Sequence, residues 1–167
     1  MVKDLENLEF GEVSESDAQT MIDEIDSILK NNGTESVAQI RDELQSSMTE
    51  SAGVFRVAES LKSQMKAIKA LRERFKNIRI EDKSRLFNTE LQEAIELGHM
   101  LDYSTFIVKG ALAREESRGA HFREDFPTRN DDKFLKHTMA YMSNRGDVSL
   151  DFMNVKLGIL EVKERTY

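Results

Sequence analysis

The sequence predicts a mainly helical protein, an antiparallel three-helix bundle like a spectrin repeat that carries a small C-terminal β hairpin. Apolar residues recur at spacings of three and four as far as about residue 116, as in amphipathic helices that bury one face against each other. Near residue 148 this spacing gives way to an alternation of apolar and polar residues, which is typical of a strand with one buried face. One proline, eight methionines and no tryptophan in 167 residues also favour helices.

Three amphipathic segments are expected before residue 77. Ser14 or Ser16 is the expected N-cap of the first, and the Asn-Asn-Gly sequence at 31–33 is expected to end it, because Asn and Gly tolerate the left-handed conformation. The second is expected over 35–49, and Gly53 separates it from the third. The apolar stripes that predict the buried faces are Ala18, Met21, Ile22, Ile25, Ile28 and Leu29; Val37, Ile40, Leu44 and Met48; and Val54, Ala58, Leu61, Met65, Ile68, Leu71 and Phe75.

The longest predicted helix follows a connection over 77–87. Asn88 or Thr89 is its expected N-cap, and it is expected to end near Glu116. Its apolar stripe is Leu91, Ala94, Ile95, Leu101, Val108 and Leu112.

A β hairpin is expected from about Phe134 to Val155. The segment 134–142 is rich in residues compatible with strands, and Ser-Asn-Arg-Gly-Asp at 143–147 predicts a turn. The apolar residues that alternate along the second strand are Val148, Leu150 and Phe152.

The composition excludes several classes of protein. Without cysteine there is no disulfide scaffold, thiol nucleophile or thiolate metal site. No apolar run approaches the roughly 18 residues of a membrane span, and the N-terminus does not resemble a signal peptide, so we expect an intracellular, soluble chain without direct membrane insertion. A net charge of −7 argues against nucleic-acid binding.

Charge is unevenly distributed along the chain. Residues 1–50 carry thirteen acidic and three basic side chains, whereas residues 56–85 carry ten basic and four acidic ones. The basic segment could contact phosphates, but no aromatic residues are interleaved with it, so it is expected to face the acidic N-terminal segment instead. Its basic residues are Lys62, Lys66, Lys69, Arg72, Arg74 and Lys76.

The densest cluster of charge lies at residues 114–133, which we call the charged loop. It holds five basic residues, six acidic residues and one histidine. A charge run usually lies on a solvated helix face, where pairs four residues apart support it. This run contains Gly119 and includes Pro127, the only proline, and therefore predicts a specific loop.

His121, Glu124 and Asp125 could form a metal or acid–base site, because histidine titrates near neutral pH. However, the spacing H-x-x-E-D matches no zinc motif, and a metal requires three or four convergent ligands. The favoured interpretation is a salt-bridged network that anchors the loop against a neighbouring domain, since the guanidinium groups of Arg118 and Arg123 suit buried pairing.

The loop sequence ESRGAHFREDFP at 116–127, followed by LKHT at 135–138, resembles the signature of the succinate dehydrogenase and fumarate reductase flavoprotein subunits, where it lies in the C-terminal region. GVFR at 53–56 and RLFNTEL at 85–91 resemble two further segments of that family. Arg-Thr-Tyr at 165–167 resembles the C-terminal end of those subunits.

The resemblance implies that the chain is the C-terminal helical domain of such a subunit. No G-x-G-x-x-G fingerprint follows a predicted strand, and the residues that hold FAD and the dicarboxylate belong to an N-terminal portion outside this sequence. FAD is therefore expected in the parent protein but not on this chain, which is expected to hold no catalytic, cofactor-binding or metal-ligating residue. The family's Pro-Val and Pro-Pro-Lys are replaced at 154–155 and 162–164, which leaves the path of the tail open.

The resemblance also implies partners. The parent would oxidise succinate or reduce fumarate, a direction that this part cannot decide, and exchange electrons with an iron–sulfur subunit. It would be cytoplasmic and peripheral to the inner face of the cell membrane through partner subunits. We expect a helical bundle over 1–118, with the signature loop, hairpin and tail packed on it over 119–167. The residues expected to contact the FAD-binding and capping domains are Ser117, Arg118, Gly119, His121, Arg123, Glu124, Asp125 and His137.

Two alternatives remain at this point. The chain could be the C-terminal domain of an L-aspartate oxidase, which shares the bundle and a related ESRG segment. It could also be an autonomous acidic helical module that recruits a partner through its basic third helix. The charged loop favours the flavoprotein interpretation.

Overall fold

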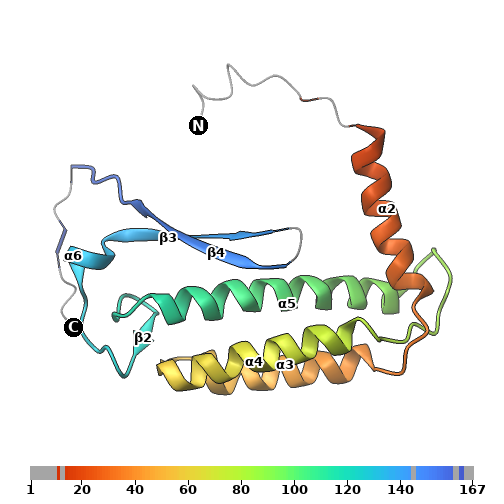
Figure 1. Ribbon diagram of the computed structural model, residues 1–167, viewed down its shortest axis with the longest axis horizontal. Helices are drawn as coiled ribbons and strands as arrows, with labels where there is room; N and C mark the ends of the chain where they lie inside the picture. Colours follow the sequence, from red (N-terminus) through yellow and green to blue (C-terminus); the bar gives the residue numbers. More distant parts are fainter. Residues whose placement is uncertain (1–10, 12–13, 144–145, 160–161, 164–167) are drawn as a thin grey trace.

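The computed structural model describes residue 11 and residues 14–143, 146–159 and 162–163. It is mainly helical with a small antiparallel pair of strands near the C-terminus, as the sequence predicts (Figure 1). The predicted motif at 165–167 lies outside the described residues. None of the helices described is long and apolar enough to cross a membrane. The elements are α2 (Glu15–Lys30), α3 (Val37–Ala52), β1 (Phe55–Arg56), α4 (Ala58–Phe75), α5 (Thr89–Ala113), β2 (Phe122–Arg123), α6 (Asp131–Phe134), β3 (Lys136–Met142) and β4 (Val148–Asn154).

Local sequence signals determine where two of the long helices begin. The Ser36 Oγ accepts a hydrogen bond from the Gln39 amide at 3.4 Å and caps α3, which is the helix predicted over 35–49. The Asn88 Oδ1 accepts one from the Leu91 amide at 2.8 Å and caps α5, as predicted. Such caps satisfy amides that have no partner inside the helix.

Helices α3, α4 and α5 lie side by side and bury their apolar faces against one another (Figure 1). The connection over 77–87 adds Ile78 and Ile80, each 1% exposed, which the sequence did not single out. The Arg79 amide donates to the Glu35 carbonyl at 2.9 Å and holds this connection beside the start of α3. The apolar side chains buried to 2% exposure or less in the three helices are Ile40, Leu44, Leu61, Ile68, Ala94, Leu97, Leu101 and Val108.

Two predicted apolar stripes are wrong at their N-terminal ends. In α2, Met21, Ile22 and Ile25 are 66%, 45% and 37% exposed. The reason is that α2 projects away from the three packed helices, so that only its last turn, at Leu29, is buried (Figure 1). Val54 is 68% exposed because the chain forms strand β1 before α4 begins.

The predicted hairpin is present as strands β3 and β4. They pair antiparallel from Lys136 opposite Asn154 to Met142 opposite Val148. The hairpin lies along α5 (Figure 1), where Val148 is buried and its carbonyl accepts a hydrogen bond from the Lys109 Nζ. The charged loop therefore connects the end of α5 to the start of a hairpin that packs back on the same helix.

Candidate functional site

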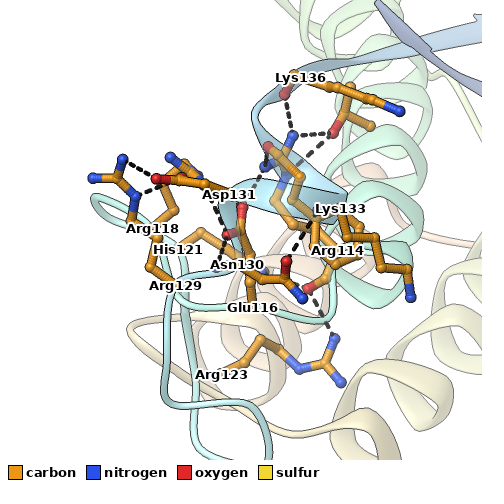
Figure 2. A network of polar contacts seen from close by, with 12 residues as sticks. Arg114, Glu116, Arg118, His121, Arg123, Arg129, Asn130, Asp131, Lys133 and Lys136 are labelled. Atoms are coloured by element: carbon orange, nitrogen blue, oxygen red, sulfur yellow. Dashed lines mark hydrogen bonds and ion pairs between the residues drawn. The ribbon is translucent and has the colours of Figure 1, made fainter. Parts of the chain in front are cut away.

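Glu116 is at the centre of the charged loop and is completely buried. Its carboxylate accepts hydrogen bonds from the Arg118 Nε at 2.8 Å and Nη2 at 3.0 Å, from the Asn130 amide at 2.8 Å and from the Arg114 guanidinium (Figure 2). Burial opposes ionisation of Glu116, but the hydrogen bonds from Arg118, Asn130 and Arg114 outweigh it and lower the pKa of the carboxyl. The loop is thus organised around a buried, ionised carboxylate.

Asp131 extends this network to the start of α6. Its carboxylate accepts a hydrogen bond from the Arg118 Nη2 at 2.6 Å and a bidentate pair from Arg129 at 2.7 and 2.5 Å (Figure 2). The hydrogen bonds from Arg129 and Arg118 lower the pKa of Asp131 to about 2. Charges of alternating sign therefore neutralise one another within the loop.

Arg123 joins the ends of two helices and is 1% exposed. Its Nη1 donates to the Ala111 and Leu112 carbonyls at 2.9 and 3.2 Å, which lie at the C-terminal end of α5, where carbonyls have no partner within the helix. Its Nε and Nη2 donate to Asp125 at 2.7 and 2.8 Å, and Asp125 in turn accepts from the Ala58 amide at the first residue of α4 at 2.9 Å. The hydrogen bonds from Arg123 lower the pKa of Asp125 to about 2.

The backbone around this pair is held by Ser117 and Gly119. The Ser117 Oγ accepts from the Arg123 amide and donates to the Phe126 carbonyl, both at 2.9 Å. Gly119 has a φ of +58°, a left-handed conformation that residues with a Cβ adopt at a cost. Strands β1 and β2 pair in parallel beside it, so the loop is attached to the segment between α3 and α4 as well as to α5.

His121 is half-buried between two arginines. Its Nδ1 lies 3.1 Å from the Arg56 Nη1, and its Nε2 lies 3.0 Å from the Arg114 carbonyl oxygen. Because a guanidinium only donates and a carbonyl only accepts, Nδ1 accepts and Nε2 carries the proton. Burial lowers the pKa of His121, and the positive charges of Arg56, Arg123 and Arg114 lower it further, so the imidazole is neutral near pH 7.

The structure brings six of the eight predicted interface residues into this arrangement, Ser117, Arg118, Gly119, His121, Arg123 and Asp125. The side chain of Glu124 is exposed and makes no hydrogen bond within the described chain; His137 is exposed on β3, where Thr138 beside it accepts from Arg114 instead. Sequence reasoning missed five residues of this arrangement: Arg56, Arg114, Glu116, Asn130 and Asp131. Their polar or charged side chains, in the charged loop or in the GVFR segment, were the signal that could have identified them.

The described residues do not fit FAD. A dinucleotide site requires a glycine-rich turn between a parallel strand and a helix N-terminus. Parallel pairing in the described chain is limited to the two-residue strands β1 and β2 and one isolated bridge between Glu35 and Ile78. No group of three or more His, Asp or Glu side chains in this part of the chain could hold a metal ion. The carboxylates of Glu116, Asp125 and Asp131 are engaged by arginines, an arrangement suited to rigid structure rather than proton transfer.

Several known proteins are similar to this chain in sequence and in structure. A family model described as the fumarate reductase flavoprotein C-terminus matches residues 41–167. The fumarate reductase flavoprotein subunit of Serratia sp. is 39% identical over 155 residues, and the succinate dehydrogenase flavoprotein subunit of Rickettsia bellii is 41% identical over 153. A solved E. coli quinol fumarate reductase matches with a TM-score of 0.86 and 36% identity over 92% of this chain and 27% of that chain.

These relatives extend well beyond the matched region. The alignments cover 92% and 90% of this chain but 26% of each of the two flavoprotein subunits. The chain thus spans about a quarter of the length of these relatives. The family model matches most of this chain. The chain belongs to the fumarate reductase flavoprotein C-terminal family.

Proposed function

We propose that this chain is the C-terminal structural domain of an FAD-dependent flavoprotein subunit that interconverts succinate and fumarate, and that it supports the flavin-binding part without performing chemistry. The observation that carries this proposal is the identity of 39–41% over nine-tenths of the chain, against only a quarter of each relative. In this proposal the FAD and dicarboxylate sites belong to the remaining part of the subunit. The absence of a dinucleotide-binding element among the described residues supports that division.

We propose further that residues 1–118 form a spectrin-repeat-like support, with α3, α4 and α5 as its packed helices. The signature loop, hairpin and tail over 119–167, which include most of the charged loop, would face the FAD-binding and capping domains. The loop is suited to this role because its buried charges already have partners, so docking does not require it to reorganise. An iron–sulfur subunit would accept the electrons, and partner subunits would hold the assembly at the inner face of the membrane.

Ion pairs of the basic segment on α4 support the proposal that this chain does not bind nucleic acid. Arg74 pairs with Glu35 at 2.9 Å and with Glu43 at 2.5 Å, both from the acidic N-terminal part of the chain. Part of the positive charge is therefore neutralised within the chain, as the sequence predicts for this segment.

A chimeric subunit tests the proposal. This chain would replace the C-terminal quarter of the E. coli fumarate reductase flavoprotein subunit, with a protease site at the junction. We expect the chimera to retain FAD and the chain to remain bound after cleavage, while the chain alone is colourless and reduces no dye with succinate. Stoichiometric flavin on the isolated chain, or immediate dissociation after cleavage, would contradict the proposal.

A further inference from the structure

Arg56 differs from the other arginines that the structure describes. Each of the others lies within 4.0 Å of a carboxylate, whereas Arg56 has no such neighbour in the described chain. Its Nε donates to the Ala52 and Gly53 carbonyls at 3.1 and 2.8 Å, and its Nη1 donates to His121. Its Nη2 makes no hydrogen bond to any described residue. Arg56 is thus held in place by neutral acceptors and lacks a counter-charge.

The environment of Arg56 makes a missing counter-charge costly. Arg56 is half-buried, so its cation is partly desolvated, and this burial lowers the pKa of the guanidinium. His121 does not offset the charge, because its neutral imidazole offers only the Nδ1 lone pair. A partly buried cation of this kind is stabilised most by an anion that brings two oxygens to the planar guanidinium.

A cavity of about 350 Å³ opens beside Arg56 and His121. Its walls come from α5, β3 and the charged loop, and its apolar lining includes Phe106, Ile107 and Ala140. Tyr103, one turn before Ile107 on the same face of α5, is 67% exposed, and its ring contacts that of Phe106 at 6.2 Å between centroids. An arginine inside an exposed aromatic and aliphatic rim has the composition of an energetic centre in a protein interface.

We propose that this cavity, the Arg56 pocket, receives a carboxylate side chain from the flavin-binding part of the flavoprotein subunit. Arg56 binds the carboxylate, His121 positions Arg56, and the rim of Tyr103, Phe106 and Ile107 excludes water from the ion pair. This inference rests on the proposed function above. The occupant follows from the unmatched positive charge and from the three-quarters of each relative's length that lie outside the matched region.

The cleavable chimera measures the contribution of the pocket directly. After cleavage of the junction, the dissociation rate of this chain from the flavin-binding part is followed by surface plasmon resonance. We expect Arg56→Lys to raise this rate at least about tenfold, because lysine keeps the charge but loses the planar two-donor geometry. Ile107→Glu should raise it similarly, because the new carboxylate competes for Arg56 and repels the incoming one. The matched control is Arg79→Lys, in an exposed arginine paired with Glu81, which should leave the rate unchanged.

The outcomes separate the two proposals. If the unmodified chain dissociates at once, the proposed function fails. If it stays bound and both Arg56→Lys and Ile107→Glu dissociate at the unmodified rate, the Arg56 pocket is not the anchor. Because Ile107 is half exposed, its variant tests the pocket even where an Arg56 variant folds poorly. Nuclear magnetic resonance of the isolated chain with millimolar succinate should shift no His121 signal; a saturable shift would mean that the pocket binds a free dicarboxylate, and would overturn the proposal.

Discussion

In the charged loop, Glu116 and Arg123 are 0% and 1% exposed, yet each has its charge matched by partners in the same chain. In α2 the opposite holds, because Met21 and Ile22 are apolar and yet 66% and 45% exposed. A charged segment is therefore part of the folded core, and an apolar stripe is not. The difference shows that burial in this chain follows the available partners rather than hydropathy alone.

The two regions also differ in what they connect. The loop joins the first residue of α4 to the last turn of α5 through Asp125 and Arg123, so it stabilises the packed helices themselves. Helix α2 contacts the rest of the chain mainly through its last turn, where Leu29 is buried and the Lys83 Nζ donates to the Leu29 and Asn31 carbonyls at 2.9 and 2.8 Å. Loss of the loop contacts should therefore affect the whole fold, whereas changes on α2 should remain local.

The largest expected effect is that of Glu116→Gln. The variant keeps the shape of the side chain but removes the counter-charge of Arg114 and leaves Arg118 with the more exposed Asp131 alone, so the free energy of unfolding should fall by about 3–5 kcal/mol. Urea denaturation at pH 7 measures it. Glu115→Gln is the control, because its pair with Lys133 is exposed and should contribute at most about 0.5 kcal/mol. Equal effects of the two variants would mean that the buried network does not stabilise the chain.

A smaller effect is expected for Asp125→Asn, about 1–2 kcal/mol at pH 7, because Asp125 accepts from the first amide of α4 and pairs with Arg123. The pKa of Asp125 is about 2 in the folded chain, below its usual 3.8, so as pH falls the unfolded chain takes up the proton first. The stabilisation is therefore complete above about pH 5 and is lost between about pH 4 and 2.

Denaturation of the wild type and the Asp125→Asn variant at several pH values checks this dependence. The difference in unfolding free energy between the two proteins should decrease as pH falls through that window. A difference that is constant from pH 7 to pH 2.5 would contradict the assignment of Asp125.

The smallest effect is expected on α2. Ile22→Ser should change the free energy of unfolding by no more than about 0.5 kcal/mol, because the side chain is exposed. Leu29→Ala, in the buried last turn of the same helix, should cost about 2–3 kcal/mol. Thermal denaturation of both variants compares the two ends of the helix. A loss from Ile22→Ser as large as that from Leu29→Ala would show that α2 packs along its whole length in solution.

The features that the sequence predicted correctly depend on local signals. The cap at Asn88, the long α5 and the hairpin alternation follow from residues a few positions apart. The features that it missed depend on contacts between distant segments. The hydrogen bonds from Arg123 to the end of α5 and the contact of Arg56 with His121 need the loop and the β1–β2 pair to be in place. The exposure of Met21 could not be read from its spacing, because periodicity identifies an apolar face but not the surface that covers it.

The central claim, that the charged loop is part of the folded core while α2 is peripheral, can be tested by hydrogen exchange of the isolated chain. The amides of Asn130 and Ala58 donate to Glu116 and Asp125. They should exchange with opening free energies within about 1 kcal/mol of the global value, because their exposure requires the packed helices to separate. Amides in the first turns of α2, around Ile22, should exchange through local opening at about 2 kcal/mol or less. Exchange of Asn130 and Ala58 as fast as the α2 amides would contradict the claim.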